Sequence, residues 1–194
     1  MPSITKLAAL AAAVSLAVPS LAAASLAPAS APTPGAKPAA APAAHAAAKP
    51  AAPSDKAQLE ALEKRFIAAF QAKDVTRVMA NYAKDGLFVF DVSPPRDYAG
   101  WAAYKKDWEE LFAAFPGPLK VSISDLSITA VGTVGYSHSI QAAQFTTKDG
   151  SKFDVVVRVT DVYRKIGGKW KIVLEHVSVP VDLATGKADL LSKY

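Results

Sequence analysis

The sequence predicts an α+β domain in which helices pack on one face of an antiparallel sheet. Apolar residues at helical spacing dominate the region from Ser54 to Phe115, which contains one short apolar run of strand length. Long segments of strand character follow as far as Val181, separated by turn dipeptides. Helices collected ahead of hairpin-connected strands are typical of α+β domains.

The N-terminus has the three regions of a cleavable signal peptide, which we place at residues 1–24. Lys6 supplies a positive charge, and residues 7–18 form an unbroken stretch of small and apolar side chains, too short to span a bilayer. Pro19 ends the stretch, and residues 22–24 are the small residues that a signal peptidase requires. We therefore expect export to the periplasm or the medium, with no membrane span after cleavage. An uncleaved anchor or a disordered alanine-rich tail is the alternative.

Residues 25–53 are almost entirely alanine and proline. Repeated proline prevents a continuous helix, and alanine offers too little apolar surface to build a core. We expect a semi-extended, disordered linker that leads into a domain at residues 54–181, followed by a polar, frayed tail at residues 182–194.

Composition excludes several classes of site. The chain of 194 residues has no cysteine, which excludes disulfides and thiolate-based zinc sites. Three of its 22 basic residues precede Ser54, so the domain carries 19 basic against 17 acidic residues, and no run of Lys or Arg exceeds two. We therefore expect no nucleic-acid partner. We also expect no cofactor.

Two helices open the domain. Ser54 can cap the first helix, in which Leu59, Leu62, Phe66 and Phe70 share one face. Asp74 can cap a second helix, with Val75, Val78, Met79 and Tyr82 as its apolar stripe, and Asp85-Gly86 ends it. Residues 87–92 then form an apolar run of strand length, which Ser93-Pro94-Pro95 terminates.

A third helix and four strands complete the domain. The helix carries Trp101, Tyr104, Trp108, Leu111, Phe112 and Phe115 on one face, and Pro116-Gly117-Pro118 stops it. Turns near Val131-Gly132, Asp149-Gly150 and Gly167-Gly168 divide the remainder into hairpin-connected strands.

The last two turns predict a strand register. Asp-Gly and Gly-Gly favour two-residue hairpin loops, which would place Lys148 opposite Ser151 and Ile166 opposite Lys169. One face of the three strands is then mostly apolar and the other mostly polar, as one-sided burial requires.

This register leaves three ionisable residues on the apolar face. It places Asp161 opposite His138 and diagonally from His176, within reach of long side chains. A buried carboxylate between two imidazoles is a candidate acid–base cluster. A self-satisfied Asp–His pair in a core is the alternative. A metal site is not expected, because no further carboxylate or histidine completes the ligand set.

Asp91 is a second candidate for proton transfer. It ends the first apolar strand, where apolar walls would raise its pKa. An ordinary capping or loop Asp is the alternative. Candidate ligand contacts from the helices and the apolar face are Tyr82, Tyr98, Trp101, Tyr136, Tyr163 and Ser178.

Three stretches of the domain carry a family resemblance. They are residues 66–74, residues 82–91, and the closing series 160–165, 168–173 and 175–180, which reads TDVYRK, GKWKIV and EHVSVP. The chain resembles the SnoaL-like branch of the nuclear transport factor 2-like superfamily, which includes ketosteroid isomerases, polyketide cyclases and a kinase association domain. The resemblance covers about Asp55 to Val181. It implies a cone-shaped barrel, in which three helices pack on a strongly bent, mainly antiparallel sheet around an apolar pocket, and it implies dimers.

The resemblance also assigns roles to single residues. Asp91 resembles the general base of ketosteroid isomerases, and Asp161 resembles the protonated acid that donates to the enolate oxygen in those enzymes. Phe66 stands where they have a tyrosine, so this oxyanion hole would be incomplete.

Three functions are therefore open. The first is a pocket that binds, and transforms, a small apolar molecule bearing a carbonyl or hydroxyl group. The second is a dimeric interaction module with a vestigial pocket, and the third is an isomerase or cyclase using acid–base chemistry. In each case we expect a homodimer, formed through Phe145, Val173, Val177 and Val179 on the polar face of the sheet.

Overall fold

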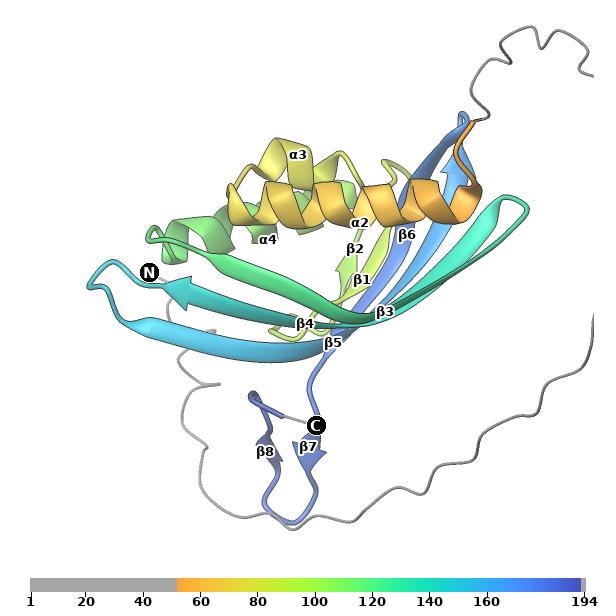
Figure 1. Cartoon of the computed structure of the whole chain (residues 1–194). Coiled ribbons are helices and arrows are strands. Elements are labelled where there is room, and N and C mark those ends of the chain that lie inside the picture. Colours follow the sequence, from red (N-terminus) through yellow and green to blue (C-terminus); the bar gives the residue numbers. More distant parts are fainter. Residues whose placement is uncertain (1–51, 193–194) are drawn as a thin grey trace, which may run out of the picture. The chain divides into compact units, whose positions relative to one another are not determined.

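A computed structural model describes residues 52–192 and shows the predicted α+β architecture (Figure 1). The helices α2 (Asp55–Gln71), α3 (Val75–Met79) and α4 (Trp101–Ala114) lie on the concave side of a curved sheet. The sheet curls around them without closing, because its edge strands do not pair with each other. The predicted helix, helix, strand, helix and four hairpin strands occur in this order, with the two-residue strand β2 added between β1 and α4.

The main sheet has six strands in the order β2-β1-β6-β5-β4-β3. Their bounds are β1 Phe88–Phe90, β2 Tyr98–Ala99, β3 Lys120–Val131, β4 Val134–Thr146, β5 Lys152–Ile166 and β6 Lys169–Ser178. Only the β1–β6 pair is parallel, and the other pairs are antiparallel. Because β1 lies beside β6, the end of the first strand reaches the end of the last long strand.

Both predicted helix caps are present. The hydroxyl of Ser54 accepts a hydrogen bond from the backbone N–H of Ala57, and the carboxylate of Asp74 accepts one from Arg77. The second helix is shorter than expected, since Tyr82 lies beyond α3 and bridges to Ile172 of β6. Tyr82 therefore points into the core from the sheet side of the helix pair.

The predicted strand register is wrong at two places. The loop at Asp149-Gly150 has five residues, because the last β4–β5 pair is Thr146 with Lys152. The carboxylate of Asp149 accepts hydrogen bonds from Thr147 and Ser151, which holds this wider turn closed. Every β4–β5 pair is consequently shifted by one residue.

The second shift is a β-bulge in β6. The Gly167-Gly168 turn is a two-residue loop as predicted, with Ile166 opposite Lys169 and both glycines at positive φ. Between Tyr163–Ile172 and Val162–Leu174 the ladder skips Val173, so the pairing beyond it moves by one residue.

These two shifts exchange the faces of residues beyond them. Of the apolar residues that we assigned to the outer face, Phe145 is buried, Val177 lines a pocket and Val179 packs against the core. The predicted dimer patch at these residues is therefore wrong, because a one-residue shift turns them towards the helices.

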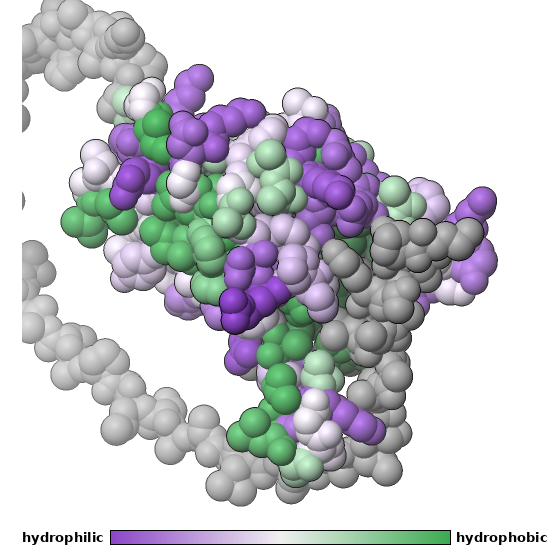
Figure 2. Space-filling model, turned by 180° about the vertical axis from the view of Figure 1, so that it is seen from behind, coloured by the Kyte–Doolittle hydropathy of each residue, from purple (hydrophilic) through white to green (hydrophobic). Residues whose placement is uncertain are grey.

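The C-terminal segment differs from the frayed tail that we expected. Strands β7 (Val181–Asp182) and β8 (Lys187–Ala188) form a small hairpin, and Leu190 is buried against the main sheet, where its carbonyl accepts a hydrogen bond from the N–H of Val156. Figure 2 shows apolar residues at this lower end of the molecule, where Leu183 is 94% exposed.

The signal peptide predicted at residues 1–24 lies outside the described residues, as does the linker up to residue 51. Among residues 52–192, no helix has the length and apolar character needed to cross a membrane.

Candidate functional site

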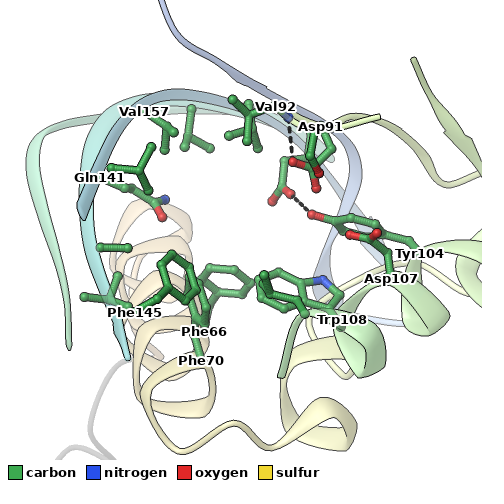
Figure 3. A pocket seen from close by; sticks show the side chains of 18 of the residues that line it. Phe66, Phe70, Asp91, Val92, Tyr104, Asp107, Trp108, Gln141, Phe145 and Val157 are labelled. Carbon is green, nitrogen blue, oxygen red and sulfur yellow. Dashed lines mark hydrogen bonds between the residues drawn. The ribbon is translucent and has the colours of Figure 1, made fainter. Parts of the chain in front are cut away.

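An apolar pocket lies between α2, α4 and the concave face of the sheet (Figure 3). Helix residues Phe66, Phe70 and Trp108 form its floor in this view, and valines of β5 form the opposite wall. The volume of the pocket that is open to the centre of a water molecule is about 110 Å³. A cavity that holds one water molecule has roughly 10–15 Å³ by the same measure. The pocket is thus large enough for a small organic molecule.

Three carboxyl groups stand at one end of this pocket. Asp91 follows β1, Asp107 lies on α4, and Glu175 lies on β6 (Figure 3). No Lys, Arg or His is among the described residues that line the pocket. The parallel pairing of β1 with β6 explains why Asp91 and Glu175 come together, since Val89 lies opposite Glu175.

Glu175 is held by two tyrosines. Its carboxyl oxygens accept hydrogen bonds from the hydroxyls of Tyr82, at 2.8 Å, and Tyr104, at 2.6 Å. Burial raises the pKa of Glu175, and the hydrogen bonds oppose part of this rise. The two phenols fix the orientation of the carboxyl group at the pocket wall.

Asp91 has the properties of a proton acceptor near neutral pH. Burial, then the charges of Asp107 and Glu175, raise its pKa to about 7, against hydrogen bonds from the backbone of Val92 and Ser93. A carboxyl group with this pKa can both take up and release a proton at physiological pH.

A second acidic group lies behind the pocket wall. Asp161 is buried, and it lies directly opposite Ser137 on β4 and Glu175 on β6. Burial and the negative charges of Glu175 and Glu63 raise its pKa well above the usual value.

The network continues to α2. The hydroxyl of Tyr163 lies 2.7 Å from that of Ser137 and donates to the carboxylate of Glu63, also at 2.7 Å. Glu63 is only 3% exposed, and burial raises its pKa to about 7. Four carboxyl groups, those of Glu63, Asp91, Asp161 and Glu175, thus lie in or beside the core, and burial raises the pKa of each.

The predicted cluster of Asp161 with two histidines is wrong. His138 and His176 both lie opposite Thr160, on the outer face of the sheet, whereas Asp161 points inward. The physical reason is the one-residue shift on each side of β5, which moves both histidines to the other face. Asp161 meets Ser137 and Glu175 instead.

The predicted ligand contacts fall into three groups. Tyr82 and Tyr163 are buried in the acidic network, and Tyr98 donates to Asp107 at the pocket rim. Trp101 donates to the carbonyl of Met79, at 3.1 Å, outside the pocket lining. Tyr136 and Ser178 lie on the outer face, so the register shift removes them from the pocket.

Several residues of the pocket and of the acidic network behind it were missed from the sequence. Glu175 was assigned to the polar outer face, and Glu63, Asp107 and Gln141 were not singled out. Glu63 carried a usable signal: it stands four residues after Leu59 and so belongs to the apolar stripe of its helix. Gln141 carried none without the correct register. Its amide points into the cavity in Figure 3.

One buried donor in the pocket lacks a partner. The indole N–H of Trp108 has no hydrogen bond, although this side chain is only 6% exposed. Buried donors are almost always paired, so this group is available to a bound molecule. Within residues 52–192, no group of three or more His, Cys, Asp or Glu side chains is arranged to hold a metal ion.

Comparisons with known proteins agree with this geometry. A family model described as "SnoaL-like domain" matches residues 59–182. A nuclear transport factor 2-like protein of unknown function from Pseudomonas putida is 27% identical, with 72% of this chain and 96% of that chain covered and a TM-score of 0.66. A ketosteroid isomerase-like protein from Erwinia carotovora is 19% identical, with 64% and 95% covered and a TM-score of 0.55. A search of curated proteins finds no match.

Proposed function

Because the chain belongs to the SnoaL-like domain family, we propose that it binds a small, uncharged and largely apolar molecule bearing a carbonyl or hydroxyl group. The observation that carries this proposal is the apolar pocket with Asp91 at its acidic end. Phe66, Phe70 and Trp108 would contact the apolar body of the ligand. Its oxygen would face the polar end of the cavity.

The charge of the lining selects the ligand. Asp91 and Glu175 stand in the pocket, and its described lining contains no Lys, Arg or His, so an anionic ligand would meet like charges in a medium of low dielectric. A neutral carbonyl or hydroxyl can instead receive a hydrogen bond from a protonated carboxyl group or from the indole of Trp108.

The chemistry that we propose is proton transfer by Asp91. As a carboxylate, it would take a proton from a carbon next to a carbonyl, and as an acid it would return that proton to another atom of the same molecule. This is the chemistry of an isomerase or a cyclase. A pocket that only binds its ligand uses the same contacts without the transfer.

The test compares three bicyclic probes on the full chain. We expect neutral 2-naphthol to bind in isothermal titration and 2-naphthoate, which carries a negative charge on the same rings, to bind at least about tenfold more weakly. Equal affinity for the two, or no binding of 2-naphthol, would overturn the ligand assignment. Deuterium exchange at the carbons beside the carbonyl of 2-tetralone, measured by NMR, tests the chemistry. Exchange that Asp91→Asn abolishes supports catalysis, and exchange that persists in that variant rules out Asp91 as the base.

We also propose export and dimerisation. The tripartite sequence of residues 1–24 supports export. A row of apolar side chains on the outer face of the sheet supports a homodimer, and it keeps the interaction-module function as a second candidate. The row consists of Phe88, Tyr136, Val162 and Leu174, which the strand pairing makes neighbours.

A further inference from the structure

A line of polar side chains runs through the core from the ligand pocket to a second space. It begins at Glu175 in the pocket wall and passes through Asp161, Ser137 and Tyr163. It ends at Glu63, which lines a separate groove between α2 and β3. The line therefore connects two spaces with different lining residues.

Each step of the line is a contact between hydrogen-bonding groups. Glu63 and Ser137 each lie 2.7 Å from the hydroxyl of Tyr163. The Asp161 Oδ2 atom lies 3.5 Å from the hydroxyl of Ser137 and 3.4 Å from that of Tyr163. Asp161 and Glu175 are a directly opposed cross-strand pair, and both side chains are buried.

One oxygen of Asp161 is a place where a proton would be stabilised. Asp161 Oδ1 is buried and has no hydrogen-bond partner. Two facing carboxyl groups can be satisfied when one carries a proton and donates it to the other. A proton on Asp161 Oδ1 would make this atom a donor to Glu175, and the two carboxyl groups would then share one proton.

The groups that face the pair keep that proton in place. Tyr82 and Tyr104 donate to Glu175, while Asp91 and Glu63 add negative charge nearby. All of these groups are acidic or phenolic. Burial raises the pKa values of all four carboxyl groups, and neighbouring negative charges raise those of Asp91, Glu63 and Asp161 further.

We propose that this line is a proton path, by which Glu175 in the pocket exchanges protons with solvent in the Glu63 groove. The sequence of transfers conserves every proton. A protonated Glu63 passes its proton to the oxygen of Tyr163, whose own proton moves to Ser137. The Ser137 proton moves to Asp161 Oδ2, and the proton on Oδ1 moves to Glu175. The net result is one proton moved from Glu63 to Glu175. Tyr163 and Ser137 are restored, and Asp161 keeps one proton, which rotation of its carboxyl group returns from the Oδ2 to the Oδ1 position.

Under the proposed function, the carboxyl groups of the pocket need to exchange protons with solvent while a ligand is bound. An apolar ligand that fills the pocket excludes water from Asp91 and Glu175, so an acid or base there loses direct exchange with solvent. A route through the core restores that exchange while the pocket is occupied. Tyr163 and Glu63 are positioning and relay residues here, because neither lines the ligand pocket.

The experiment measures how fast the protonated carboxyl group of the Asp161–Glu175 pair exchanges its proton for deuterium. The readout is the shift of the infrared C=O band of this group. Val157→Phe fills the pocket from the β5 wall and removes any need for a ligand. In this filled background we expect Tyr163→Phe to slow the exchange about tenfold or more, since it deletes the hydroxyl that joins Glu63 to the rest. In the open background, where water reaches Glu175 directly, the same change should have little effect.

Two further variants make the result decisive. Tyr98→Phe removes another phenol that donates to a carboxylate, that of Asp107, but lies off the line, so exchange in the filled background should stay within about twofold. Glu63→Gln ends the path without removing Tyr163, and it should slow exchange as Tyr163→Phe does. Equal rates in the filled protein with and without Tyr163→Phe or Glu63→Gln would overturn the path. This result would not affect the ligand assignment, which the binding of 2-naphthol and 2-naphthoate tests, because this experiment uses no probe molecule.

Discussion

Asp161 and Glu175 lie directly opposite each other on β5 and β6, so two carboxyl groups meet in the core at about 3% exposure each. Two buried charges of the same sign without a counter-ion are unfavourable, and a shared proton removes one of them. The pair therefore couples the protonation state of the pocket wall to that of the network behind it. The first predictions follow from this coupling.

The folded protein should be more stable at pH 5 than at pH 8. The fold raises the pKa of Asp91 from 3.8 to about 7 and that of Glu63 from 4.5 to about 7, and it also raises those of Asp161 and Glu175. Between about pH 4 and pH 7 the folded state then binds more protons than the unfolded chain, so stability falls as the pH rises. One pKa unit corresponds to about 1.4 kcal/mol, so Asp91 alone accounts for at most about 4 kcal/mol.

Urea denaturation across this pH range measures the effect. Asp91→Asn and Glu63→Gln should each flatten the fall in unfolding free energy, because neither replacement can ionise. Asp149→Asn is the control, since this exposed carboxylate has a lowered pKa and should leave the slope above pH 5 unchanged. Stability that rises from pH 5 to pH 8 would contradict the raised pKa values.

Asp161→Asn should stabilise the protein at pH 8. The amide keeps the shape of the side chain, donates a hydrogen bond to the Glu175 carboxylate and removes one buried acid. We expect a gain of about 1 kcal/mol in urea denaturation at pH 8. Carboxyl carbon NMR would report the titration of Glu175 directly. His138→Gln is the matched control on the outer face, and an equal effect from it would refute the contact seen here.

The fold could be predicted from the sequence because its signals are local. Ser54 and Asp74 cap helices where their neighbours have helical spacing, and Gly167-Gly168 forms the tight turn that glycine permits. These features depend on a few adjacent residues, and the structure confirms them.

The site could be predicted only in part, because it depends on register. A loop of five residues in place of two at Asp149, and one bulged residue at Val173, are each enough to turn a strand over. Neither leaves a clear mark in the alternation of apolar and polar residues, since both faces of β5 carry valines. The position of Asp91 in the pocket lining could be predicted because its place at the end of a short strand does not depend on the register.

The outer face of the sheet should hold a homodimer together. Tyr136, Val162, Leu174 and Phe88 form a continuous apolar row across four strands, and Tyr136 is 53% exposed in the single chain. Sedimentation at a protein concentration of tens of micromolar, which is the order of dissociation constant expected for a modest interface, should show a dimer. Tyr136→Glu should dissociate it. Leu183→Glu, on the exposed hairpin between β7 and β8, should leave the dimer intact. A monomeric parent protein would refute this assembly.

The exported chain should begin near Ser25. Residues 22–24 offer the small side chains that a signal peptidase recognises after the apolar stretch. Limited proteolysis should then remove residues up to about Pro53, which the alanine and proline composition leaves without a core. Intact-mass measurement of the exported protein tests the first point, and a mature form that still carries Met1 would exclude cleavage.

Trp108→Phe should weaken the binding of a ketone without weakening that of a hydrocarbon. The indole N–H is buried without a partner. A hydrogen bond from it to a ligand carbonyl would contribute about 1 kcal/mol to binding. Titration of 2-tetralone should therefore show a loss of about fivefold in affinity, while naphthalene, which accepts no hydrogen bond, should bind about equally to both proteins.

The stability of the Trp108→Phe variant separates a ligand contact from a structural one. The smaller phenyl ring loses packing contacts, but the variant no longer buries an unpaired N–H group, which is itself unfavourable. Because these two effects oppose each other, we expect the free energy of unfolding to change by less than about 1.5 kcal/mol. Trp101→Phe is the matched control: its indole donates to the carbonyl of Met79, at 3.1 Å, so this variant should lose stability but keep its affinity for 2-tetralone. If both probes lose affinity equally in Trp108→Phe, the residue serves as an apolar wall and its N–H does not reach the ligand.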